Sequence, residues 1–235
     1  MNIQQAAISI SLTKPVKERP ISFNAAMAKA VAKGFKTHTR RQLAKINGIG
    51  NVTEVNRHQS LWHMLDKKGQ VRQLTDDEMS LHCPFGQSGD RLWVREPWQY
   101  AMPTYSAKTK NRFVYVANDD EKPFWIDADG SLRDRWLPGF LMPREACRMI
   151  LEITKIGVEH LNEISDQDVF KEGVRELPGQ EGNPDTWWSA DPREPTLHDR
   201  TPQGAFKKLW NSLGGNWTDN PLVWVISFRS LDQSR

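Results

Sequence analysis

The chain has 235 residues, a formal net charge of +3 and a hydrophobic fraction of 38%, which suits one domain with insertions and a packed core. So small a charge excludes a chain that attracts polyanions over its whole surface, and any nucleic-acid contact has to come from a local patch. No apolar run reaches membrane-spanning length and no secretory leader opens the sequence, so we expect a cytoplasmic protein that does not contact membranes.

Residues 1–19 are predicted to form a tail or an edge strand. Isoleucine and leucine alternate weakly with serine over residues 8–12, but Pro15 and Pro20 then interrupt regular structure. The domain proper is therefore expected to span residues 20–235.

A helix is predicted over residues 24–33, because this run is rich in alanine, carries Met27, Ala30 and Val31 at helical spacing, and is followed by Gly34 as a C-cap. Directly after it come an amine, two hydroxyls, an imidazole and two guanidinium groups. These are Lys36, Thr37, His38, Thr39, Arg40 and Arg41. Such a cluster indicates a site for a polyanion or a carbonyl compound. The simpler alternative is that the basic residues only compensate the helix dipole.

Three stretches are predicted to be insertions. Turn residues around two strand-like runs indicate a hairpin near residues 45–80, and residues 100–140 contain one recognisable strand and one turn. Repeated proline and glycine in residues 176–201 are typical of a long loop or lid.

The run 91–96 alternates as a strand does, with Leu92 and Val94 on one face and Arg91, Trp93 and Arg95 on the other. Either set can be the one that faces the core. A tryptophan between two arginines suits the stacking of a base. Further strands are predicted near residues 148–158 and 222–230, and further helices over 165–171 and 202–212.

Several segments together resemble the activating-signal-cointegrator homology (ASCH) domain, a PUA-like family, in the long form common in phage and prophage proteins. The first is Gly-x-Lys-Thr-x-Thr-Arg-Arg over residues 34–41, and the others cover residues 83–96, 142–153, 158–173, 206–210 and 220–228. The matching blocks include about half of the chain. The resemblance implies an α+β fold, namely a small PUA-like β-barrel with two or three flanking helices and several inserted hairpins and loops.

The resemblance also implies a chemistry. Lys36, Thr39 and Glu172 match a proton acceptor, a nucleophile and a proton donor in small bacterial ASCH enzymes that hydrolyse N4-acetylcytidine. A lysine can act as a base only where burial or nearby cations lower its pKa, and a threonine hydroxyl needs such a base beside it. This chain departs from those enzymes in its greater length and in Phe35. For Glu172 the simpler alternative is an exposed carboxylate at a helix end.

The leading hypothesis is therefore an amidohydrolase that acts on an acylated or otherwise modified pyrimidine nucleoside, without a metal or another cofactor. Its expected substrate-binding residues are Thr37, Arg40, Arg41, Trp93, Arg95, Glu96 and Trp98. We also expect at least one of Trp93, Trp98, Trp187 and Trp188 to line the pocket, because an aromatic ring recognises the face of a base.

The competing hypothesis is a nucleic-acid-binding module, for RNA rather than DNA. In it Lys36, Arg40, Arg41 and Arg95 hold phosphates while Trp93 or Trp98 stacks on a base. A ribonuclease is a third alternative, again implied by the family resemblance. The partner is thus expected to be a nucleoside or a nucleic acid, and the sequence leaves the oligomeric state open.

Overall fold

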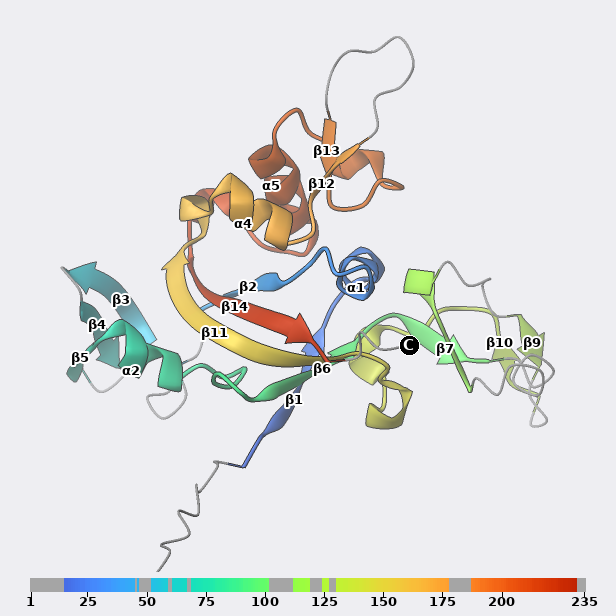
Figure 1. The fold of residues 1–235 in the computed structure, drawn as a ribbon, viewed down its shortest axis with the longest axis horizontal. Coiled ribbons are helices and arrows are strands. Elements are labelled where there is room, and N and C mark those ends of the chain that lie inside the picture. The colour runs from blue at the N-terminus through green and yellow to red at the C-terminus, as the bar shows by residue number, and fades with distance from the viewer. Residues whose placement is uncertain are drawn as a thin grey trace, which may run out of the picture.

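The computed structural model describes residues 15–44, 46, 52–58, 61–66, 69–101, 112–118, 124–126, 130–177 and 187–231. Within these ranges strands are many and helices few, so the fold is α+β (Figure 1). The predicted tail lies in part outside the described residues, which begin at Pro15.

The largest sheet has five strands, and Figure 1 shows that it is strongly curved. In order across the sheet they are β1 (Glu18–Ser22), β6 (Arg91–Arg95), β11 (Ile150–His160), β14 (Leu222–Ser230) and β2 (His38–Gln42). β1 pairs with β6 in parallel, and the other neighbours are antiparallel. Within the described residues no pairing joins β1 to β2, so this sheet is open and the predicted closed barrel is not observed.

Small separate sheets occupy the predicted insertions. β3 (Val52–His58), β4 (Leu61–Asp66) and β5 (Val71–Leu74) form an antiparallel sheet followed by α2 (Asp76–Leu81). β7 (Trp98–Tyr100) pairs with β8 (Phe113–Tyr115), and β9 (Trp125–Ile126) with β10 (Leu132–Arg133). Residues 176–201, predicted as a loop, contribute most of a pair formed by β12 (Arg175–Leu177) and β13 (Trp187–Ser189), while residues 178–186 lie outside the described residues.

Three helices lie near the edge strand β2: α1 (Ala25–Ala32), α4 (Asp166–Lys171) and α5 (Pro202–Ser212). Each begins where a side-chain oxygen accepts a backbone N–H, namely that of Asn24, Ser165 or Thr201. In Figure 1, α4, α5, β12 and β13 gather on one side of the curved sheet, with α1 and β2 facing them. Short 3-10 helices cover Val116–Asn118, Gly139–Leu141, Arg144–Ala146, Leu161–Glu163, Pro195–Leu197 and Trp217–Asp219.

The main core lies between this sheet and the helices. On β6 the buried apolar residues Leu92 and Val94 belong to it, and on β14 so do Val223, Trp224 and Ile226. A second cluster, formed by Trp98, Tyr115, Met142 and Ala146, supports the β7–β8 pair.

The turn before β6 holds the edge strand β1 in place through Asp90. Asp90 is buried and its carboxylate accepts the backbone N–H groups of Lys17 and Gln87 at 3.1 Å each. The same carboxylate forms an ion pair with Arg19 at 3.1 Å. Burial raises the pKa of Asp90, but these donors outweigh burial and hold the pKa below its ordinary value.

Candidate active site

Lys36 and Glu172 form a buried pair beside the sheet. Lys36 Nζ lies 2.5 Å from Glu172 Oε2 and 2.9 Å from the carbonyl oxygen of the same residue. The two residues are only 1% and 2% exposed. Glu172 is therefore not the solvent-exposed helix end that the simpler alternative assumed.

The backbone around both residues explains why they meet. Gly34 ends α1 with a φ of 72° and Gly173 ends α4 with a φ of 106°, and both values favour glycine. Between them, Thr37 N–H donates to the carbonyl of Lys171 at 2.8 Å, and Phe228 N–H donates to the carbonyl of Thr37 at 2.9 Å. The segment that carries Lys36 is thus held between α4 and β14.

Arg40 extends the Lys36–Glu172 pair into a network of ion pairs. Its guanidinium group is fully buried and contacts Glu159 at 2.6 Å and both Asp168 and Glu172 at 3.2 Å. A buried guanidinium group needs such partners, because an unpaired buried charge is costly. Arg40 therefore holds the second oxygen of the Glu172 carboxylate while Lys36 holds the first.

Burial sets the protonation of the cluster. The pKa of Lys36 lies below its ordinary value because of desolvation, which Glu172 opposes and the guanidinium groups of Arg41 and Arg40 reinforce. Burial and Lys171 likewise lower the pKa of His38. Burial would lower the pKa of Arg40 too, but Glu172 and Glu159 outweigh it and raise that pKa. A buried lysine with a lowered pKa is the type of group that enzymes use as a base.

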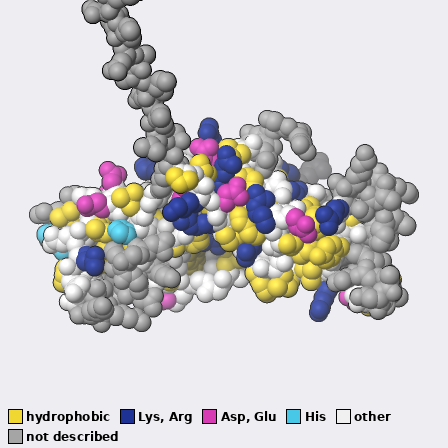
Figure 2. Space-filling model, turned by 90° about the horizontal axis from the view of Figure 1, so that it is seen from below, with side chains coloured by type: hydrophobic (Ala, Val, Ile, Leu, Met, Phe, Trp, Pro, Cys, Tyr) yellow, Lys and Arg dark blue, Asp and Glu magenta, His cyan; other side chains and the backbone are white. Residues whose placement is uncertain are grey.

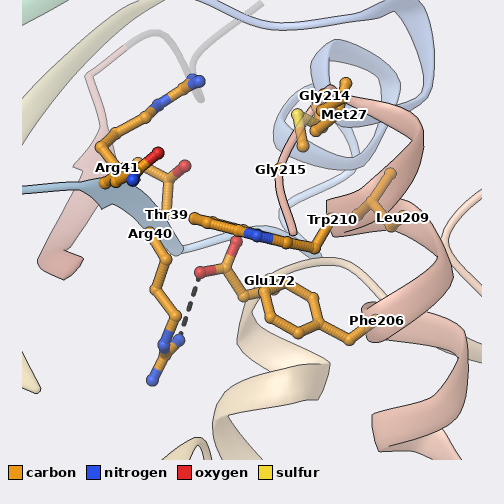
Figure 3. Close-up of a pocket in the computed structure, with 12 residues that line it drawn as sticks. Met27, Thr39, Arg40, Arg41, Glu172, Phe206, Leu209, Trp210, Gly214 and Gly215 are labelled. Atoms are coloured by element: carbon orange, nitrogen blue, oxygen red, sulfur yellow. Dashed lines mark hydrogen bonds and ion pairs between the residues drawn. The ribbon is translucent and has the colours of Figure 1, made fainter. Parts of the chain in front are cut away.

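Glu172 faces a pocket of about 180 Å³, which we call the Glu172 pocket (Figure 3). Its polar lining comes from Thr39, Arg40, Arg41 and Gln42 of β2 together with Glu172. Its apolar lining comes from α1, α5 and the turn after α5, through Met27, Phe206, Leu209, Trp210, Leu213, Gly214 and Gly215. Lys36 is not among the lining residues and contacts the pocket through Glu172.

Two of the lining residues carry a buried nitrogen without a hydrogen-bond partner in the described part of the chain, namely Arg41 Nε and Trp210 Nε1. Another nitrogen of the same Arg41 guanidinium group, Nη2, donates to the carbonyl of Ser22 at 2.6 Å. The guanidinium carbon lies 5.4 Å from the centre of the Phe23 ring. The Arg41 guanidinium group is therefore held by Ser22 and Phe23, and its Nε is buried.

The remaining predicted substrate-binding residues lie elsewhere. Trp93 is covered by the guanidinium groups of Arg95 and Arg144, 4.6 and 5.9 Å from its ring centre. Glu96 is fully buried and binds Arg148 through two contacts of 2.8 Å. Each of these side chains has a structural partner, and none of them lines the Glu172 pocket.

At least one of Trp93, Trp98, Trp187 and Trp188 was expected to line the pocket, but none of them does, and this counts against a base that stacks on them. Trp98 packs in the second core cluster, and Trp188 stacks on Phe170 with ring centres 5.1 Å apart. Trp187 lies against Arg200, 4.1 Å from the ring centre. The aromatic residues of the pocket are instead Phe206 and Trp210, one helical turn apart on α5.

The sequence did not indicate these two residues as pocket residues, nor Glu159 and Asp168 as partners of Arg40. The (i, i+4) spacing of Phe206 and Trp210 predicts a shared helix face, but no local pattern shows that this face meets β2.

No group of three or more His, Cys, Asp or Glu residues that could hold a metal ion occurs in the described ranges. None of the helices in those ranges is long and apolar enough to cross a membrane. No protein-family model matches this chain, and comparison with curated proteins and with solved structures gives no match either.

Proposed function

We propose that this protein is an ASCH-like amidohydrolase that removes the acyl group from an N-acylated pyrimidine of the N4-acetylcytidine type. The observation that carries this proposal is the 2.5 Å contact between Lys36 Nζ and Glu172 Oε2 in a buried site beside Thr39. The open five-stranded sheet would then be a PUA-like barrel whose closure is incomplete in the described residues.

The buried pair supports the proposal because burial lowers the pKa of Lys36 and so favours its neutral amine. The proposed mechanism starts from that neutral amine with a proton on the Glu172 carboxyl group. In that state Lys36 can accept a proton and Glu172 can donate one, which are the two tasks of amide hydrolysis.

In the first step Thr39 Oγ1 attacks the acyl carbon and its proton passes to Lys36 Nζ. The C–N bond breaks as the Glu172 carboxyl group gives its proton to the leaving nitrogen. The products are a threonine ester, the lysine ammonium and the glutamate carboxylate. The step requires Lys36 Nζ to come within hydrogen-bond reach of Thr39 Oγ1 when substrate is bound.

In the second step a water molecule attacks the ester and its proton passes to the Glu172 carboxylate. The ester bond to Thr39 breaks, and the threonine oxygen takes a proton from the Lys36 ammonium. The carboxylic acid is released and all three side chains return to their starting protonation states. Arg40 keeps Glu172 in place through its 3.2 Å contact during both steps.

The placement of the basic residues favours this enzyme over the binding module. Lys36 and Arg40 have fully buried side chains that are engaged with carboxylates, so they are not available to phosphates at the surface. Figure 2 shows a face of the molecule on which Lys and Arg side chains are interspersed with Asp and Glu and with apolar groups. On that face no extended surface of one sign is visible.

The decisive experiment incubates the protein with a panel of N-acylated nucleosides and follows the products by mass. We expect free carboxylic acid and the deacylated nucleoside. Lys36→Arg should abolish the reaction, because a guanidinium group cannot accept a proton near neutral pH. Lys155→Arg, at an exposed lysine that lines neither cavity, is the matched control and should react at the wild-type rate. Wild-type activity of Lys36→Arg would remove Lys36 as the base.

A further inference from the structure

A second cavity adjoins the Glu172 pocket, and nothing in the proposed chemistry uses it. It has a volume of about 260 Å³ and lies between α1, Phe35, the start of β12 and the turn after β13. We call it the Phe35 cavity. Its apolar wall is formed by Ala26, Ala30, Phe35, Ala190 and Pro192.

The linings of the two spaces include residues that are consecutive in the chain. Glu172 lines the first and Gly173 lines the second, and on α1 the same holds for Met27 and Ala26. Consecutive Cα atoms are about 3.8 Å apart, so the two spaces adjoin at these points. The buried Lys36 directly follows Phe35 in the chain.

The charge around the Phe35 cavity is positive. Lys29, Lys33, Arg175 and Arg193 line it, and Asp191 is its one acidic lining residue among those described. Asp191 is neutralised by an ion pair with Arg193 at 3.2 Å. Lysines and arginines around an apolar space select a ligand that has both an anionic group and an apolar body.

Phe35 gives the cavity a stacking surface. Phe35 is 44% exposed, whereas Trp93, which also lies under guanidinium groups, is only 9% exposed. The guanidinium group of Arg175 lies 4.7 Å from the centre of the Phe35 ring and is fixed by hydrogen bonds to the carbonyls of Phe170, Val174 and Phe35. Aromatic rings and guanidinium planes are the surfaces on which unpaired bases stack.

We propose that the Phe35 cavity binds the nucleotide next to the target in a single-stranded polynucleotide, with its base against Phe35 and the backbone phosphates near Lys29 and Lys33. The acylated pyrimidine then enters the Glu172 pocket while its neighbour occupies the Phe35 cavity. This inference rests on the proposed function only for the identity of the target base. The physiological substrate is accordingly a polynucleotide rather than a free nucleoside.

The test measures binding separately from hydrolysis. A fluorescein-labelled single-stranded RNA of eight cytidines is titrated with the protein, the anisotropy is followed at several salt concentrations, and cytidine monophosphate serves as competitor. We expect the octamer to bind at least about ten-fold more tightly than the mononucleotide, because stacking on the second base and added phosphate contacts both contribute.

Two variants locate the contact. Phe35→Ala should weaken octamer binding about five-fold or more. Lys33→Gln should weaken it and reduce the slope of log affinity against log salt by about 0.7. Phe140→Ala and Lys155→Gln alter exposed residues that do not line the cavity and should leave affinity unchanged. Because Lys33 is exposed at the end of α1, its substitution tests the proposal even if Phe35→Ala fails to fold.

The outcomes separate this inference from the proposed function. Equal affinity for octamer and mononucleotide, no binding of the octamer, or wild-type octamer affinity in folded Lys33→Gln would overturn the Phe35 cavity as a nucleotide site. Cavity-dependent binding of the octamer without hydrolysis of an acetylated octamer would support the binding site while removing the amidohydrolase. Hydrolysis of the free nucleoside with no preference for the acetylated octamer would uphold the enzyme and overturn the inference.

Discussion

Lys36 Nζ lies 2.5 Å from Glu172 Oε2 although 136 residues separate the two in the chain. Both side chains are buried, with 0% and 2% of their surface exposed, and Glu172 also lines the Glu172 pocket. In the proposed mechanism the pair holds one proton, and the position of that proton decides whether the pair is ionic or neutral. The reactivity of Thr39 would then depend on a property of the pair rather than of either residue alone.

The lowered pKa of Lys36 predicts the pH dependence of the reaction. In the proposed active state the Lys36–Glu172 pair holds one proton, so kcat/KM should fall as pH rises and the pair loses that proton, with a midpoint below the ordinary lysine value of about 10.4. Initial rates on an N-acylated nucleoside across the pH range measure the midpoint. Lys155→Arg, at an exposed lysine outside both cavities, should show the same profile. Undiminished kcat/KM up to pH values above the ordinary lysine pKa would contradict the assignment.

Asp90→Asn should lower the free energy of unfolding by about 1.5–3 kcal/mol at neutral pH, because the carboxylate accepts two backbone N–H groups and pairs with Arg19. The folded-state pKa of Asp90 is lowered, so its stabilisation is present above the unfolded pKa of about 3.9 and is lost as pH falls through the folded value. Urea denaturation of both proteins at neutral and acidic pH checks this. The difference should shrink on acidification, and Glu176→Gln, at an exposed carboxylate, should show none.

Gly173→Ala should destabilise the protein and displace Glu172. Alanine is strained at a φ of 106°, and its Cβ would lie 3.1 Å from the Cβ of Ala30. Strain of this kind costs about 1–3 kcal/mol. At Gly130 the φ is 81° and a Cβ would meet nothing within 4 Å. Gly130→Ala therefore measures the loss of stability that comes from backbone strain alone. The melting temperature and the activity should both be lower in Gly173→Ala than in Gly130→Ala. Equal losses in the two variants would show that the contact with Ala30 does not matter.

Gly215→Ala should reduce activity more than stability. A Cβ at this position would overlap the indole nitrogen of Trp210, so the ring has to leave its place in the Glu172 pocket. Displacing a positioning group by about 1 Å can lower the rate about a hundred-fold. Gly157→Ala is the matched control, because its nearest contact is an ordinary 4.0 Å to Val225. Unchanged kcat/KM in Gly215→Ala would show that Trp210 does not position the substrate.

Local elements could be predicted from the sequence because their causes are local. The caps of α1, α4 and α5 are encoded by Asn24, Ser165 and Thr201 at the first position and by glycine at the end of α1 and α4. The alternation of apolar residues predicted β6 but left open which face meets the core, and the structure places Leu92 and Val94 there.

The sequence did not show that the sheet stays open or which tryptophans are covered. A closed barrel would need β1 to pair with β2, and the described residues show no such pairing; whether two distant edges pair leaves no mark on local periodicity. Trp93 was expected to be open for stacking, but Arg95 and Arg144 cover it, and Arg144 lies far away in the sequence. The partners of Arg40 were missed for the same reason, because Glu159 and Asp168 reach it only through the tertiary fold.

The edge position of β2 has a consequence for the timing of folding. In the described part of the chain β2 pairs only with β14. The strand that carries Thr39 and Arg40 can therefore join the sheet only after residues 222–230 have been synthesised. During synthesis a long interval separates the two segments, and contacts of such high sequence separation form late. A nascent chain that already contains Lys36 and Glu172 would therefore lack the pairing that orders β2 until residues 222–230 have been synthesised.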